Sequence, residues 1–217
     1  SVQVISMVIL ALVTALALNR KIRLRGFFRS VFFYPVLLSP VVVALIWKWF
    51  LRYDNGLLNS LLVEAGYDRV QFLANGNWAR FWVIVVSDWA QMGFYTLILL
   101  AGLQAIPGSL YEAAEIDGAN SFQQFRSVTL PLLMPTMTVV LVLAFIRAVQ
   151  VFDQVFVLTN GGPGYATTTL SIEVFTYAFT RGDLPAGMST GVLIGLFTLI
   201  IMIFELKFLL KNEEVYN

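Results

Sequence analysis

Long apolar runs restrict what this 217-residue sequence can fold into. A helix needs roughly 20 mostly apolar residues to cross about 30 Å of hydrocarbon, and every backbone N–H and C=O there must be bonded within the protein. Five runs meet this requirement, and we predict a membrane-spanning helix for each. They cover about 1–18, 30–50, 81–106, 132–152 and 188–206. The predicted fold class is an all-α integral membrane protein, a polytopic helix bundle.

The composition supports this class and excludes several kinds of catalytic site. Charged residues make up 12% of the chain, whereas a soluble domain carries about a quarter. Cys and His are absent, which excludes disulfides, zinc sites and His-based triads, and we predict no catalytic residue and no metal site. No phosphate-binding loop GxxxxGK[ST] occurs, so we expect no cofactor on this chain. The net charge of +1 gives no case for nucleic acid.

Positive charge sets the predicted orientation. The segment 19–29 has no acid, and its basic residues are Arg20, Lys21, Arg23, Arg25 and Arg29. Such a segment favours the cytoplasm, so alternation places loops 51–80 and 153–187 outside. A short apolar piece in the first of these loops, 57–65, predicts an interfacial helix. Because the chain opens on Ser1 within apolar sequence, we expect a sixth span to be missing at the N-terminus.

A polar interruption at 109–128, on the cytoplasmic side, predicts two short helices. Ser109 with Glu112, and Ser121 with Gln124, have the spacing of capping boxes, and Gly118 is expected to supply a left-handed stop to the first helix. We expect the second helix to end before Pro131. Helices of about two turns are unstable alone in water, so the pair requires something to pack against. The alternative is an amphipathic linker on the membrane surface, which would be richer in Lys and Arg.

The residues of this interruption resemble the EAA loop of ABC-importer permease subunits. The matching positions are Glu112, Ala113, Ala114, Asp117, Gly118, Ala119, Phe125, Leu130 and Pro131. In that family the loop is a cytoplasmic coupling helix that fits a groove on an ATP-hydrolysing subunit. The resemblance implies a type I permease fold, a single transmembrane domain over 1–217, in the cytoplasmic (inner) membrane of a bacterium or archaeon. It also implies a second related permease subunit, two ATP-binding subunits that hold ATP and Mg²⁺, and an extracytoplasmic solute-binding protein.

A second motif lies in the later outer loop. Its residues are Thr159, Asn160, Gly161, Gly162 and Pro163. This tight turn precedes a segment at 167–180 with helical spacing, which predicts a re-entrant or interfacial helix. The turn and its threonines resemble the MalF-like or UgpA-like branch of carbohydrate permeases. The alternative is an ordinary glycine-rich connection.

Polar residues inside two spans predict a substrate pathway. They are Ser87, Asp88, Gln91, Phe94 and Tyr95 on the third span, with Arg147 and Gln150 on the fourth. Ionisable residues in spans face the bundle interior or a cavity, and amides beside an aromatic ring suit a polyhydroxylated ligand. The resembling family builds its sugar site from these two helices. Arg147 favours a phosphorylated or acidic ligand; alternatively, Asp88 and Arg147 form an ion pair that only joins the helices.

The predicted function is a non-catalytic, lipid-embedded permease subunit of a binding-protein-dependent ABC importer for a sugar or sugar-like solute. Two alternatives stay open at this point. The same machinery would serve glycerol phosphate or a polyol. An ion-coupled secondary carrier would instead use Asp88 and Arg147 as a charge relay.

Overall fold

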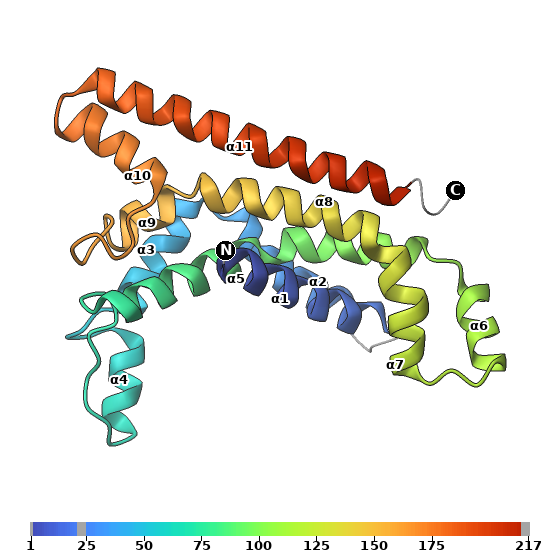
Figure 1. The fold of residues 1–217 in the computed structure, drawn as a ribbon. Helices are drawn as coiled ribbons and strands as arrows, with labels where there is room; N and C mark the ends of the chain where they lie inside the picture. Colours follow the sequence, from blue (N-terminus) through green and yellow to red (C-terminus); the bar gives the residue numbers. More distant parts are fainter. Residues whose placement is uncertain (1, 21–24, 214–217) are drawn as a thin grey trace. The chain divides into compact units, whose positions relative to one another are not determined.

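The computed structural model describes residues 2–20 and 25–213, and within these residues every regular element is helical (Figure 1). Four helical stretches are long and apolar enough to cross a membrane: Val2–Asn19 (α1), Gly76–Ala105 (α5), Ser121–Val149, and Leu184–Phe204 within α11 (Leu184–Glu213). A fifth is obtained if α2 and α3 are counted as one bent span. The predicted all-α membrane fold is confirmed. Ser1, and Lys21 and Arg23 of the predicted basic loop, lie outside the described residues.

The remaining elements are shorter. They are α2 (Arg25–Phe33), the 3-10 turn η1 (Tyr34–Leu37), α3 (Pro40–Phe50), α4 (Leu57–Glu64), α6 (Gly108–Ile116), α7 (Ser121–Gln124), the π turn η2 (Phe125–Thr129), α8 (Leu130–Val149), α9 (Asp153–Leu158), α10 (Leu170–Phe175) and the π turn η3 (Thr176–Thr180).

The predicted span 30–50 is not one continuous helix. It is broken after Phe33 by η1, and α3 starts anew with Pro40 in its first turn. Pro35 lies in η1, and both Pro35 and Pro40 lack a backbone N–H. Pro40 is tolerated at a helix start, where that donor has no partner in any case. The two prolines therefore divide the run into two helices.

The prediction that a short helix ends before Pro131 is wrong. Residues 121–149 run continuously as α7, η2 and α8, with Pro131 and Pro135 inside. In the π turn the N–H of Leu130 bonds the carbonyl of Phe125, five residues back, so the ladder is already widened next to the proline that lacks a donor. The helix thus continues through both prolines.

The chain divides into two compact units. The first unit comprises Ser1–Tyr34, Met92–Phe145 and Ile201–Asn217. In α1, buried residues recur every three or four positions and form one face: Val4, Met7, Val8, Ala11, Ala15 and Leu18. A Cβ at Gly102 of α5 would lie 2.7 Å from the Oγ1 of Thr136 on α8, so these two helices approach closely there.

The second unit comprises Pro35–Gln91 and Ile146–Ile200. Its core lies between α3, the first half of α5 and α9, where the ring of Trp47 is 5.7 Å from that of Trp82 and 5.8 Å from that of Trp89. The predicted helix in 57–65 is confirmed as α4. Asn59 fixes it: this side chain is 1% exposed and exchanges hydrogen bonds of 3.0 and 2.8 Å with the backbone of Val70.

Candidate functional site

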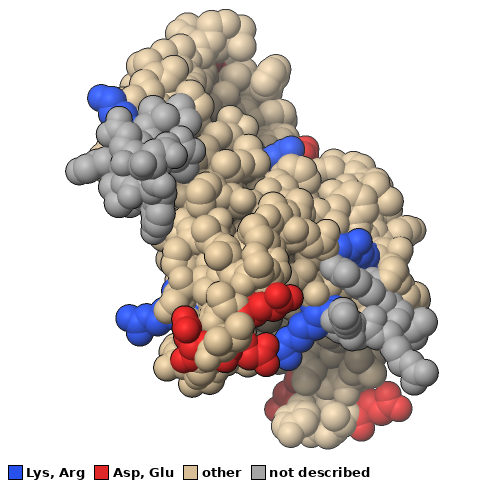
Figure 2. All heavy atoms as spheres, turned by 90° about the vertical axis from the view of Figure 1, so that its right-hand side faces the viewer, with Lys and Arg blue, Asp and Glu red and all other residues tan. Residues whose placement is uncertain are grey.

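The helical hairpin α6–α7 (residues 108–124) is a surface element of the first unit. None of its residues is buried. Its acids Glu112, Glu115 and Asp117 are exposed, and Figure 2 shows acidic side chains gathered on the face that carries this hairpin. Ala113 is exposed and Ala114 half-buried. Because alanine side chains are small, another protein can approach the backbone of α6 closely on this side.

The turn between the two helices is a Schellman motif centred on Gly118. Gly118 has φ of 79°, a conformation in which a side chain is disfavoured. The N–H of Ala119 bonds the carbonyl of Ala114 at 2.9 Å, and that of Gly118 bonds the carbonyl of Glu115 at 3.0 Å. The predicted left-handed stop at Gly118 is confirmed.

Both predicted capping boxes are wrong in position. α6 begins at Gly108 with Pro107 as its N-cap and no side-chain cap, because the restricted backbone of Pro107 already sets the entry to the helix. α7 is capped one residue earlier than expected. Asn120 Oδ1 accepts from the N–H of Gln123 at 3.0 Å, and Gln123 Oε1 accepts from the N–H of Asn120 at 2.8 Å. Asn ranks at least as high as Ser at this position, so N-x-x-Q competed with S-x-x-Q.

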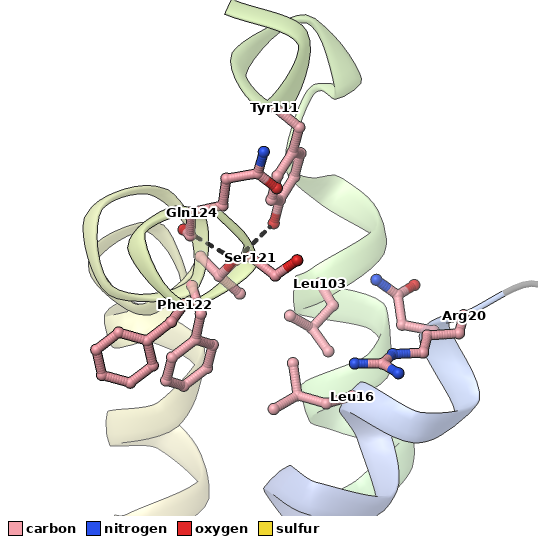
Figure 3. A pocket seen from close by; sticks show the side chains of 10 residues that line it. Leu16, Arg20, Leu103, Tyr111, Ser121, Phe122 and Gln124 are labelled. Atoms are coloured by element: carbon pink, nitrogen blue, oxygen red, sulfur yellow. Dashed lines mark hydrogen bonds between the residues drawn. The ribbon is translucent and has the colours of Figure 1, made fainter. Parts of the chain in front are cut away.

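The hydroxyl of Thr129 ties the hairpin to the base of α8. The hydroxyls of Tyr111 on α6 and Thr129 in η2 lie 3.0 Å apart, and Thr129 is 5% exposed (Figure 3). The Thr129 hydroxyl also donates to the carbonyl of Gln124 at 3.5 Å. The sequence contained no signal for this contact, since it joins residues that only the fold brings together. It gives α6 a direct link to the start of the long helix.

In the second unit, the predicted turn at 159–163 is confirmed and is held by the threonines after it. Residues 159–169 are called the threonine turn below. The hydroxyl of Thr167 lies 2.7 Å from that of Thr159 and donates to the carbonyl of Gly162 at 2.7 Å. Thr168 donates to the carbonyl of Gly161 at 3.1 Å, and Thr169 to that of Val151 at 3.0 Å. The segment then enters α10 and η3, so the predicted helix is confirmed, and its re-entrant or interfacial placement stays a prediction.

The backbone of the threonine turn requires its glycines. Asn160 has φ of 51°, and Gly161 follows with φ of 83°. A Cβ at Gly161 would also lie 2.9 Å from the Thr168 hydroxyl oxygen, so that position excludes a side chain on two grounds. The conformation of this turn thus depends on its glycines.

The predicted pathway residues differ sharply in exposure. Ser87 (0% exposed), Asp88 (3%) and Tyr95 (1%) are buried along α5. Gln91 is half-buried, and Phe94, 43% exposed, has its ring 5.3 Å from that of Tyr95.

Arg147 and Gln150, at the end of α8, are both exposed. These two, with Ser87, Asp88 and Gln91, belong to the second unit, whereas Phe94 and Tyr95 belong to the first. Their assembly into one site, and an Asp88–Arg147 ion pair, stay predictions.

Together these features define a class: a polytopic helical membrane protein that presents an exposed EAA hairpin. Residues 7–212 match the model of the family described as "binding-protein-dependent transport system inner membrane component", and the chain belongs to this family. The resemblance to ABC-importer permeases is thereby confirmed.

Named relatives cover most of the chain. It is 42% identical over 199 residues to the trehalose/maltose transport system permease protein MalF of Thermococcus litoralis, covering 92% of this chain and 67% of the relative. It is 34% identical to the multiple sugar-binding transport system permease protein MsmF of Streptococcus mutans, covering 97% and 72%. It is 32% identical to the arabinooligosaccharides transport system permease protein AraP of Bacillus subtilis, covering 90% and 64%. The chain thus spans about two thirds of these relatives' length.

A solved structure agrees with the fold. One chain of a bacterial ABC transporter involved in the import of the acidic polysaccharide alginate is similar with a TM-score of 0.83 and 25% identity. The match covers 96% of this chain and 77% of that one. A second crystal structure shows the alginate transporter in complex with a periplasmic protein bound to an alginate pentasaccharide. One of its chains has a TM-score of 0.81 to this one, at 25% identity, and the match covers 94% and 74%.

Proposed function

We propose that this chain is the permease subunit of a binding-protein-dependent ABC importer that carries a sugar or sugar-like solute into a bacterial or archaeal cell across the cytoplasmic membrane. The α6–α7 hairpin carries the proposal. Its turn and its second helix are fully capped, yet none of its residues is buried. An ordered element with no buried residue of its own is expected to pack against another protein. The names of the relatives support a carbohydrate as the solute.

Energy enters from outside this chain. Two ATP-binding subunits hold ATP and Mg²⁺, because the sequence has no phosphate-binding loop, and a second related permease completes the membrane part. Closure of the ATP-binding subunits moves the α6–α7 hairpin as a rigid body. The chain itself performs no covalent chemistry.

Within the first unit, two contacts would transmit that movement. The Tyr111–Thr129 hydrogen bond joins α6 to the base of α8, and the close approach at Gly102 joins α8 to α5 through Thr136. A displacement of the hairpin is thereby passed to two long helices and not absorbed in a flexible loop.

The solute path runs along α5 and the end of α8, with Gln91 and Arg147 as the polar contacts. Arg147 is exposed, and a cation there suits an acidic or phosphorylated saccharide. The structural neighbours that import alginate, an acidic polysaccharide, support including acidic sugars among the candidates.

A charge reversal on the hairpin tests the function. Glu112→Lys is expected to abolish ATP-driven uptake in vesicles that contain the chain and its co-expressed ATP-binding subunits, because the exposed Glu112 faces the docking partner. Glu64→Lys, at another exposed acid, which ends α4, is the matched control and should leave uptake intact. Equal uptake by both variants would exclude the hairpin as the coupling element.

Uptake measurements with defined solutes separate the alternatives. A panel of neutral sugars, acidic sugars, glycerol phosphate and polyols, delivered with the solute-binding protein, identifies the solute class. Arg147→Gln should weaken uptake of the acidic members most. Transport by the chain alone, driven by an ion gradient without ATP, would instead identify a secondary carrier.

A further inference from the structure

A cavity of about 570 Å³ lies behind the α6–α7 hairpin, entirely within the first unit. It is bounded by the last turns of α1 and α5 on one side and by α6, α7 and η2 on the other (Figure 3). Its lining includes Leu16, Asn19 and Arg20 from the region of α1, with Leu103, Ser121 and Phe125 from the other elements. None of them belongs to the predicted solute path.

The lining is amphiphilic and carries charge of one sign. Leu16, Leu103 and Phe125 form its apolar part, and Arg20 is its one charged residue. Figure 3 shows the Arg20 side chain turned toward Leu16 and Leu103. No acid is among these lining residues, so an anion placed there meets a cation without a competing carboxylate.

The position of Arg20 relates the cavity to the membrane surface. Arg20 directly follows α1, an apolar helix of spanning length, so it lies at the level where hydrocarbon gives way to headgroups. The sequence continues with further cations at Lys21, Arg23 and Arg25. Basic segments next to a span attract anionic lipids of the cytoplasmic leaflet.

The neighbouring helix α2 has the composition of a helix that lies in the membrane interface. Phe27 is 62% exposed, Phe28 40% and Val31 49%, while Arg29 is half-buried. A basic amphipathic helix with exposed aromatic residues inserts its apolar face among headgroups. This second feature independently points to lipid at the same end of the first unit.

We propose that the cavity behind the hairpin binds an anionic phospholipid of the cytoplasmic leaflet. Its phosphate contacts Arg20, the neutral donors Asn19 and Ser121 surround the headgroup, and one acyl chain lies against Leu16 and Leu103. A soluble phosphate would leave that apolar wall in water, whereas a lipid covers it. The bound lipid fills the space between the hairpin and the spans, so the lipid composition of the membrane adjusts how firmly the hairpin is supported.

Lipid binding to the full chain tests the proposal. The chain, purified from membranes, is titrated with phosphatidylglycerol or with phosphatidylcholine of identical acyl chains, and bound lipid is counted by native mass spectrometry. Arg20→Gln should weaken phosphatidylglycerol binding about fivefold, the effect of one cation at an anionic surface. Arg126→Gln, an exposed arginine in η2 that does not line the cavity, should leave it unchanged.

A second pair of variants tests the apolar wall without altering charge. Leu16→Trp fills the cavity and should also reduce phosphatidylglycerol binding, whereas Leu12→Trp, one turn away on α1 and outside the lining, should not. This pair decides the matter if Arg20→Gln fails to fold. Equal losses from Arg20→Gln and Arg126→Gln, equal binding of the two lipids, or full binding by Leu16→Trp would each overturn the proposal.

Discussion

The α6–α7 hairpin and the threonine turn both break up apolar sequence, yet they are held in different ways. In the threonine turn, the hydroxyls of Thr167, Thr168 and Thr169 each bond a carbonyl of the same unit. In the hairpin, one side-chain bond, Tyr111 to Thr129, joins α6 to the helix below, and no residue is buried. The first is complete within its own unit. The hairpin is ordered by its own turn and cap, but all of its residues stay accessible, as expected for an element that binds a partner.

This difference predicts opposite sensitivities. Damage to the threonine turn should appear as lost stability of the isolated chain. Damage to the hairpin should appear mainly as lost coupling in the assembled transporter.

Thr167→Val removes two contacts of the threonine turn at once. It leaves the Gly162 carbonyl without its 2.7 Å donor in a buried place, which should cost about 2 kcal/mol of folding free energy. Thermal denaturation in detergent measures the loss. Thr138→Val is the control, since its hydroxyl bonds only the helical carbonyl of Met134. Equal melting temperatures for the two variants would show that the turn is not held by its hydroxyls.

Gly118→Ala places a Cβ at a residue with φ of 79°, which costs about 1–2 kcal/mol of local stability in the hairpin turn. Gly108→Ala is the matched control, because both sites have open space around a Cβ and only Gly118 has the left-handed conformation. We expect Gly118→Ala to lower ATP-driven uptake while the melting temperature of the isolated chain changes little. Equal uptake by both variants would contradict a role for the turn geometry in coupling.

Asn120→Ala removes the true cap of α7 and should cost about 1 kcal/mol of local helix stability. Ser121→Ala removes the cap that the sequence pattern favoured and should have almost no effect. Hydrogen exchange of the amides at Phe122 and Gln123, which bond the Asn120 side chain, measures the difference. Faster exchange in Ser121→Ala than in Asn120→Ala would restore the original assignment.

Tyr111→Phe deletes the hydroxyl that meets Thr129 and should cost about 0.5 kcal/mol, since the contact is only partly buried. The expected phenotype is more ATP hydrolysed per solute carried, because α6 loses its direct link to α8. Tyr165→Phe, at a tyrosine that is 78% exposed, is the control. An unchanged ratio in Tyr111→Phe would mean that backbone continuity alone transmits the movement.

Patterns that depend on one segment were readable from the sequence. The spans follow from apolar length, the stop at Gly118 from backbone preference, and the turn at 159–163 from its glycines. Boundaries were less accurate where two signals competed, as Asn120 and Ser121 did for the same cap. The prolines were also ambiguous, since Pro35 and Pro40 divide a run whereas Pro131 lies within a continuous helix.

Contacts between distant segments could not be read from the sequence. No sequence pattern around Tyr111 or Thr129 indicates that their hydroxyls meet. Likewise, no pattern around Asn59 indicates that its side chain bonds the backbone of Val70. Such pairs depend on how elements pack in three dimensions. The solute pathway has the same difficulty, since polar residues on one helix indicate a face but do not specify what lies opposite.

The π turn at 125–129 has a consequence for insertions and deletions. It holds one more residue than an α-helical turn requires, and a helix rotates about 100° per residue. Deleting a single residue there would give regular α-geometry from α7 into α8. The hairpin would keep nearly its present direction, because an α-turn closes with one residue fewer than a π turn. Deleting one residue within the regular part of α8 would instead rotate the hairpin by about 100° about the helix axis. The π turn is thus a position where the chain can lose one residue without redirecting the hairpin.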